Sequence, residues 1–165
     1  MSTIKSTSSP ESEKVIRDFL YAHYSGVLAT ADSAGNPHAA TVYFTVDDNL
    51  CLTFATKTET QKYRNMEENN HVAFVCSDEE NQTAVQITGR IEKVTDPEEH
   101  QTMLNSMYRF SERMSKVELP PIEKLFAGDY ITLRIVPQFI KMGIFMRPDA
   151  QSNEELYETI AFESK

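Results

Sequence analysis

The sequence of 165 residues contains no tryptophan, only five glycines and only two cysteines. With so few glycines, neither a phosphate-binding P-loop nor a GxGxxG dinucleotide motif is present. Cys51 and Cys76 each lie inside an apolar run and lack CxxC spacing, so the sequence indicates neither a disulfide framework nor a zinc site. This cysteine usage favours a reducing compartment, and we expect a cytoplasmic protein.

Long apolar runs and an excess of positive charge are also missing. The N-terminal residues "MSTIKSTSSPESEK" have no apolar core typical of a signal peptide, and no later window approaches the roughly 18 apolar residues of a membrane span. The chain has 25 acidic and 16 basic residues, a formal charge of −9, which repels phosphate backbones and anionic lipid. We therefore expect neither nucleic acid nor a membrane as a partner.

The usual catalytic motifs are absent as well. The four histidines are scattered, without HxH or HExxH spacing, and metal ligation is not indicated. No GxSxG motif is present, and neither cysteine has an evident base partner. If the protein is an enzyme, a bound cofactor supplies its reactivity. The histidines are His23, His38, His71 and His100.

The length fits one domain, which at this size buries roughly two-thirds of the surface of its unfolded chain. Residues 1–9 are polar and predict a loose tail, followed by a single domain over residues 10–165. A helix is expected from Pro10 or Ser12, with Gly26 ending it. A longer helix is expected from Pro97 to about Val117, with Asp96 as N-cap and Glu99 completing a capping box.

Alternation with a period of two predicts a series of short strands between these helices. Gly89 in the middle of one of them indicates a bulge, a sharp bend or the close approach of another backbone. Short loops between successive strands favour antiparallel pairing, and the number of strands favours a closed or partly closed barrel. We therefore expect a mainly β fold with flanking helices. The predicted strands are residues 27–31, 42–46, 50–55, 71–77, 83–95, 131–135, 139–145 and 156–162.

The stretch "TKTETQKYRN" predicts a short helix with polar groups around its first turn. Thr58 with Gln61 three residues later fits a capping box, which would place residues 59–61 in the first turn. Backbone N–H groups there lack intrahelical partners and favour an anion, and Thr60, Gln61 and Lys62 can converge on one phosphate. The alternative is an ordinary capped helix after a strand, and Glu59 adds a negative charge against the anion site.

Residues 35–94 carry five motifs in a fixed order: GxP at a strand entry, FxT at a hairpin end, TxKxxNM on a helix, NNxVA into a strand, and VxIxGx in a late strand. This series resembles the flavin-binding split-barrel family typified by pyridoxamine 5'-phosphate oxidase, and more closely its general stress protein branch. The resemblance implies an antiparallel split β-barrel that forms a homodimer, with FMN in a cleft between the subunits.

The resemblance also implies which residues bind the cofactor. A segment of one strand lines the flavin ring, the end of a later strand approaches the ribityl chain and phosphate, and the helix start holds the phosphate. No catalytic acid or base is implied. The implied cofactor-binding residues are His38, Thr41, Val42, Tyr43, Ala55, Thr56, Thr60, Gln61 and Lys62.

The chain departs from the oxidase pattern in ways that bear on activity. Basic residues usually stand in the oxidase where this chain has His38, Tyr43 and Gln61, and a glutamine stands where it has Ala84. Each lost charge-assisted hydrogen bond removes roughly 1.5–3 kcal/mol, which predicts weaker FMN binding. The oxidase's C-terminal tryptophan and arginine pattern is also missing, with only Arg147 nearby, so oxidation of pyridoxamine phosphate is not expected.

The function expected from these features is that of an FMN-dependent oxidoreductase or flavin reductase-like protein using flavin for two-electron transfer. Lys62 is expected to be the counter-charge of the phosphate, and a small molecule or a reduced nicotinamide the reaction partner. The alternative is a non-catalytic, stress-related protein that sequesters FMN or another planar cofactor. A barrel binding a deazaflavin or haem is a third possibility, for which no specific residue speaks.

Overall fold

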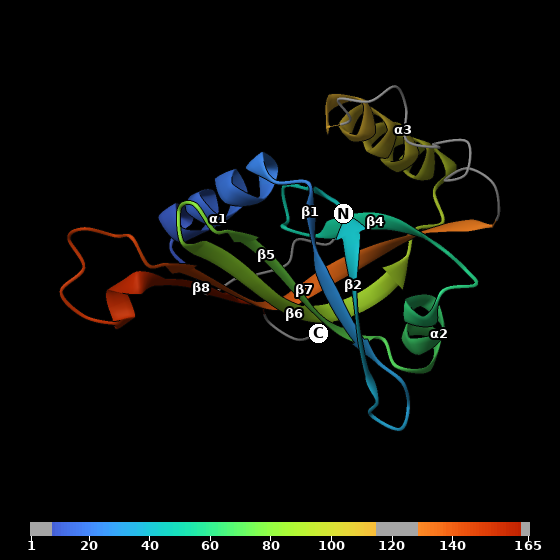
Figure 1. Ribbon diagram of the computed structural model, residues 1–165, viewed down its shortest axis with the longest axis horizontal. Coiled ribbons are helices and arrows are strands. Elements are labelled where there is room, and N and C mark those ends of the chain that lie inside the picture. Colours follow the sequence, from blue (N-terminus) through green and yellow to red (C-terminus); the bar gives the residue numbers. More distant parts are fainter. Residues whose placement is uncertain (1–7, 115–128, 163–165) are drawn as a thin grey trace.

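The structure, a computed structural model, describes residues 8–114 and 129–162 (Figure 1). The side chains of residues 107–114 are outside this description. The elements are α1 Pro10–Ala22, β1 Ser25–Ala31, β2 Pro37–Tyr43, β3 Thr45–Val46, β4 Leu52–Lys57, α2 Gln61–Glu68, β5 His71–Asp78, β6 Thr83–Lys93, α3 Pro97–Met114, β7 Tyr130–Ile144, a 3-10 turn Glu154–Leu156 and β8 Tyr157–Ala161.

All of the strands join one antiparallel sheet in the order β2-β1-β5-β6-β7-β4-β3, with β8 paired to β7. The sheet curls on itself but does not close between β2 and β3. Figure 1 shows β2 and β4 passing near one another at this opening. The predicted fold class, a mainly β antiparallel split barrel with flanking helices, is confirmed.

The strand β7 differs from the prediction, which had two strands over residues 131–135 and 139–145. The structure has one strand of 15 residues. Pro137 lacks the N–H that a sheet interior requires, and the register of β6 shifts between Thr88 and Gly89, where Gly89 lies opposite Pro137. This irregularity lets the proline lie inside a continuous strand. Of the alternatives expected at Gly89, the close approach of another backbone is confirmed, together with a local register shift.

The helix α1 begins as predicted but ends earlier. Ser9 is its N-cap, accepting a hydrogen bond from the Ser12 N–H, and Pro10 occupies the first turn. The helix ends at Ala22, and Gly26, expected to end it, lies in β1. A Cβ at Gly26 would lie 2.3 Å from Cζ of Phe74, so this glycine makes room for a core ring.

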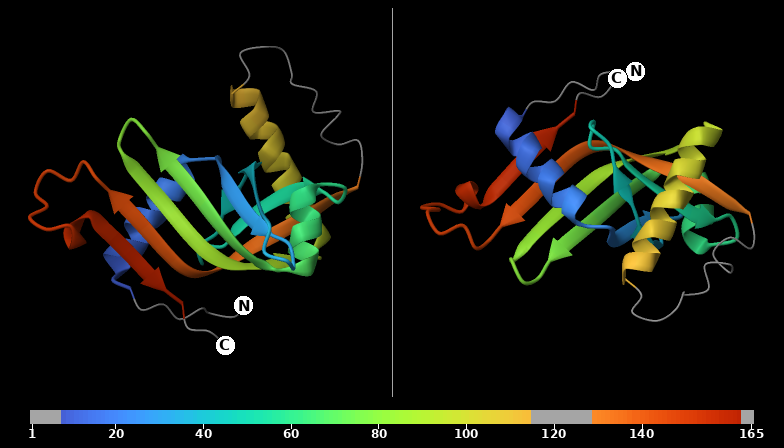
Figure 2. Two further views of the ribbon diagram at one scale, coloured as in Figure 1. Left: turned by 60° about the horizontal axis from the view of Figure 1, so that its bottom comes forward. Right: turned by 90° about the horizontal axis from the view of Figure 1, so that it is seen from above.

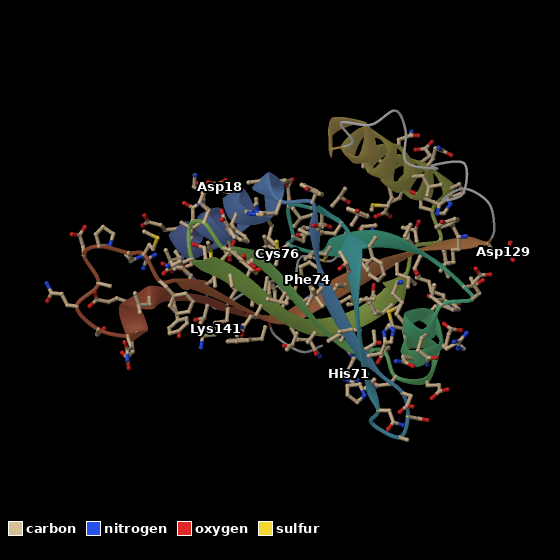
Figure 3. All side chains as sticks on the ribbon, in the orientation of Figure 1. Asp18, His71, Phe74, Cys76, Asp129 and Lys141 are labelled. Carbon is tan, nitrogen blue, oxygen red and sulfur yellow. The ribbon has the colours of Figure 1, made fainter. Side chains whose placement is uncertain are left out.

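The core lies on the inner face of the curled sheet. Apolar side chains alternate inward along the strands, and α1 adds Ile16 and Leu20 to the same cluster. The largest fully buried side chains include Phe44, Phe54 and Ile140. Figure 3 shows Phe74 and Cys76 within this interior.

The helix α3 covers the outer face of β4 and the first half of β7. His100 contacts the Thr132 hydroxyl, Glu99 pairs with Arg134, and Met103 is buried. Asp96 caps the helix as predicted, accepting from the Glu98 N–H at 3.0 Å. Glu99 does not complete a capping box, because its carboxylate forms an ion pair with Arg134. Residues 115–117 of the predicted helix lie outside the described residues. None of the helices in the described part of the chain is both long and apolar enough to cross a membrane.

The contact between Gly89 and β7 generates a prediction about stability. A Cβ at residue 89 would lie 2.3 Å from the backbone oxygen of Val136, and neither strand can retreat without losing ladder hydrogen bonds. Gly89→Ala should therefore lower the free energy of unfolding by about 1–3 kcal/mol, the usual range for overpacking. Urea denaturation measures the change, with Glu92→Ala, an exposed position on β6, as control. Equal stability of the two variants would contradict the close approach.

Candidate functional site

The predicted phosphate-binding segment lies where β4 ends and α2 begins, beside β1 and β2 (Figure 2). The N-cap of α2 is Thr60, with extended backbone dihedrals of −78° and 151°, and the helix starts at Gln61. The prediction that Thr58 is the N-cap is therefore wrong. Instead, the Thr58 N–H donates to the backbone oxygen of Asp129 at 3.1 Å, which ties the loop to the start of β7. Figure 3 labels Asp129 at that end of the strand.

The structure brings Thr56 and Thr60 together, with their hydroxyl oxygens 3.2 Å apart. The Thr60 hydroxyl donates to the Lys57 carbonyl at 2.9 Å and accepts from the Tyr63 N–H at 3.4 Å. Thr56 is buried. Both hydroxyls are thus engaged in shaping the turn, and the backbone amides remain as the first donors for an anion.

Gln61 belongs to a hydrogen-bond network that fixes α2 to the sheet. Its side-chain amide donates to Oδ1 of Asn65 at 2.7 Å, and Nδ2 of Asn65 donates to the hydroxyl of Thr30 at 3.1 Å. Arg64 in turn donates to Oε1 of Gln61 at 2.9 Å. Gln61 therefore positions the helix, and its amide is not directed to a ligand in this arrangement.

Asn65 is the structural residue that the sequence reasoning missed. It is buried, and among the described residues it makes the only side-chain hydrogen bond between α2 and β1. The asparagine of the TxKxxNM motif was the available signal. It was used for the family resemblance, but no contact was predicted for it.

Lys62 is a cation beside the start of α2. Its side chain is half-buried, and burial lowers its pKa from the ordinary lysine value. Within residues 8–114 and 129–162 no hydrogen bond or ion pair is recorded for its ammonium. A partly desolvated ammonium without a carboxylate partner beside the start of a helix is suited to an anionic group.

Glu59, which counted against an anion site, acts electrostatically on Tyr130 of the neighbouring strand β7. The pKa of Tyr130 is raised first by burial and then by the charge of Glu59. The backbone oxygen of Glu59 accepts from Arg64 at 2.7 Å, and its side chain is exposed.

The predicted flavin-lining residues are split between two faces of β2. Thr41 and Tyr43 are exposed on the outer face, whereas Val42 points into the core and is 4% exposed. The side chain of His38 lies on the inner side, opposite Thr30 in the adjacent strand, and its buried Nδ1 has no hydrogen-bond partner among the residues that the structure describes. Ala55 is half-buried in β4 opposite Thr132. Val42 can therefore contribute to a flavin site only through its backbone.

The two cysteines lie in the core as free thiols. Burial raises the pKa of Cys51 to about 12 and that of Cys76 to about 11, so neither forms a nucleophilic thiolate near neutral pH. Among the described residues no group of three or more histidine, cysteine or acidic side chains is arranged to hold a metal ion.

The capping geometry of α2 generates a second prediction. Thr60→Ala removes the cap and the partner of the buried Thr56 hydroxyl, so the free energy of unfolding should fall by about 1 kcal/mol or more. Thr58→Ala leaves its backbone bond to Asp129 intact and should change stability by less than about 0.5 kcal/mol. Urea denaturation of both variants measures the difference. A larger loss of unfolding free energy for Thr58→Ala than for Thr60→Ala would contradict Thr60 as the N-cap and favour residue 58.

Comparison with solved structures supports the same fold. General Stress Protein 26 from Bacillus anthracis str. Sterne is 21% identical, with a TM-score of 0.57 over 78% of this chain and 92% of that chain. HutZ, the heme storage protein from Vibrio cholerae, is 20% identical, with a TM-score of 0.58 over 76% and 89%. A protein named F420 reductase is 26% identical, with a TM-score of 0.58 over 75% and 94%.

No curated protein matches the chain. A family model described as pyridoxamine 5'-phosphate oxidase matches residues 12–125, which is well over half of the sequence. The same segment contains the five motifs, the helix α2 with Lys62 and most of the split barrel. The chain therefore belongs to the pyridoxamine 5'-phosphate oxidase family, and its structural neighbours in that fold include a general stress protein.

Proposed function

We propose that the protein is an FMN-binding oxidoreductase of flavin reductase-like type, with the phosphate of the cofactor held at the start of α2. The observation that carries this proposal is the half-buried, unpaired ammonium of Lys62 beside that helix end. The N–H groups of Gln61 and Lys62 in the first turn have no intrahelical acceptor. Together they supply a charge and two donors for a phosphate.

Family membership supports a planar redox cofactor at this place, and the flavin, when bound, supplies two-electron transfer. The chain itself binds and orients. Lys62 neutralises the phosphate, Thr56 and Thr60 hold the turn in shape, and the Asn65–Thr30 bond keeps α2 against β1. Tyr43 and Thr41 offer an exposed surface on β2 for the ring.

Binding should be weaker than in the oxidase because neutral residues occupy basic positions. Tyr43 carries no charge, and Gln61 is engaged with Asn65 and Arg64. Oxidation of pyridoxamine phosphate is not part of the proposal. The reaction partner is a small molecule or a reduced nicotinamide, and the protein works as a homodimer with the cofactor between its copies. The two free buried thiols are consistent with a reducing compartment, and we place the protein in the cytoplasm.

A second candidate is a non-catalytic protein that sequesters FMN or another planar cofactor. The observation that favours it is the lack of an assignable acid or base among the described residues of the site. The named neighbours also extend the choice of cofactor to F420 and haem. Titration of the purified protein with FMN, F420 and haemin, followed by absorbance, ranks the three. Tightest binding of haemin would overturn the flavin proposal.

The proposed role of Lys62 predicts that its substitution weakens FMN binding but stabilises the cofactor-free protein. Lys62→Met removes one charge-assisted contact and should weaken FMN binding at least tenfold, measured by quenching of flavin fluorescence. Because burial disfavours the charged form, the same substitution should raise the melting temperature of the cofactor-free protein at pH 7. In the parent protein, burial of the charged Lys62 lowers the free energy of unfolding. This loss should diminish as the pH rises toward the ordinary lysine pKa of 10.5, because the folded protein then holds Lys62 in its neutral form.

Lys93→Met is the matched control for this experiment. Lys93 is exposed, pairs with Glu67 of α2 at 2.9 Å and lies over the Tyr63 ring, so its loss also removes one positive charge next to the helix. FMN affinity should change less than twofold. An equal loss of affinity in both variants would show only a general charge effect and would contradict a specific phosphate contact.

Turnover separates the two candidate functions. An oxidoreductase should bleach the visible absorbance of bound FMN when NADH or NADPH is added under anaerobic conditions, and colour should return with an electron acceptor. A sequestering protein should retain oxidised flavin with either donor. Persistent oxidised flavin with both donors would count against the reductase proposal and favour the second candidate.

A further inference from the structure

Lys62 starts from the face of α2 that packs against the sheet. Residues three and four positions apart share one face of a helix, and the residues so related to Lys62 are Asn65 and Met66, which are both buried. The side chain of Lys62 is half-buried as a result. This placement withdraws part of the side chain from water and still leaves it within reach of a small molecule.

The acidic residues of α2 are engaged by groups other than Lys62. Glu67 pairs with Lys93 at 2.9 Å. Glu68 accepts hydrogen bonds from the backbone N–H and the hydroxyl of Ser33, at 3.0 and 2.8 Å. Burial alone perturbs Lys62, without an offsetting carboxylate among the described residues. The amine of Lys62 is therefore not held by an ion pair in the part of the chain that the structure describes.

The other lysines with described side chains each have a partner in the chain. Two form ion pairs with carboxylates, and two have the ammonium over a tyrosine ring. Acylation of any of these nitrogens removes the charge on which the contact depends. For Lys62 no such contact has to be broken. The pairs are Lys14 with Asp18, Lys93 with Glu67, Lys57 with Tyr130 and Lys141 with Tyr157.

The protonation of Lys62 differs from that of its neighbour Lys93 for the same structural reason. Burial lowers the pKa of Lys62, whereas the hydrogen bond to Glu67 is the main cause that raises the pKa of Lys93. At any given pH, a larger share of Lys62 is therefore the neutral amine. The neutral amine is the nucleophilic form of lysine, because its nitrogen has a free lone pair.

We infer that Lys62 is a site of N-acylation, at which the protein reacts with a small activated acyl compound such as an acyl phosphate or an acyl thioester. The lone pair of Nζ forms a bond to the acyl carbon, and the bond from that carbon to the leaving oxygen or sulfur breaks. Phosphate or thiolate departs with the electron pair of the broken bond. The nitrogen loses one proton to water, and a neutral amide remains.

Acylation of Lys62 regulates the cofactor site, a consequence that rests on the proposed function. The amide carries no charge, so it no longer neutralises the phosphate of FMN, and the affinity for FMN falls. Bound FMN in turn covers the same nitrogen and slows its acylation. The cofactor and the acyl group therefore compete for Lys62, while the core of the barrel is unchanged.

Site-resolved acetylation of the full chain tests the inference. The protein without added FMN is treated near neutral pH with acetyl phosphate or, in parallel, with acetyl-coenzyme A. It is then cleaved after glutamate and analysed by mass spectrometry. Residues 60–67 and 93–98 form separate peptides with one lysine each, Lys62 and Lys93. Lys62 should react at least about threefold faster than Lys93.

The same reaction in guanidinium chloride is the control for local sequence, because unfolding removes the difference in burial and pairing. The two lysines should then react at rates within about twofold of each other. A higher ratio of Lys62 to Lys93 acetylation in the folded protein supports the inference with either donor, and the effective donor identifies the acyl source. A ratio that is no higher in the folded than in the unfolded protein, with both donors, overturns it.

Addition of saturating FMN separates this inference from the proposed function. FMN should slow acetylation of Lys62 at least about fivefold, because its phosphate contacts that nitrogen, and should leave acetylation of Lys93 unchanged. Selective acetylation of Lys62 that FMN does not slow would refute the phosphate contact and leave the acylation site intact. FMN binding without selective acetylation would refute the acylation site and leave the proposed function intact.

Discussion

The structure depends on the pairing of one long strand with three neighbours. The strand β7 pairs with β4 through its first half, with β6 along most of its length and with β8 through its second half. The close approach of Gly89 and Val136 at the register shift allows this continuity despite Pro137. The two halves of β7 divide the molecule, because α3 covers the outer side of the first half and leaves that of the second half open.

The first half of β7 also helps to shape the loop that leads to α2. On one side of the sheet, β4 and the start of β7 form the base of the loop that leads to α2, and a hydrogen bond from Thr58 to Asp129 fixes it. The Asn65–Thr30 bond then sets the position of the helix. Lys62 is left half-buried without a compensating carboxylate among the described residues, and this burial disfavours its charged form.

The sequence predicted much of the fold because its signals are local. Ser9 and Pro10 start α1 and Asp96 starts α3 through hydrogen bonds within one helical turn, so residue type and spacing sufficed. The predictions failed where a distant residue decides. Glu99 pairs with Arg134 and not with the helix start, Gly26 makes room for Phe74, and the Thr58 N–H is bound to Asp129 while Thr60 caps α2.

At the candidate site, too, the sequence predicted local features but not those that depend on distant contacts. By itself, the sequence determined the family, the strand periodicity and the presence of a lysine in the first turn of a helix, since all are read from residue order. Only the tertiary structure decided that Gln61 is engaged by Asn65 and that Val42 points into the core. These features depend on strand register and helix placement, which are set by contacts between residues far apart in the chain.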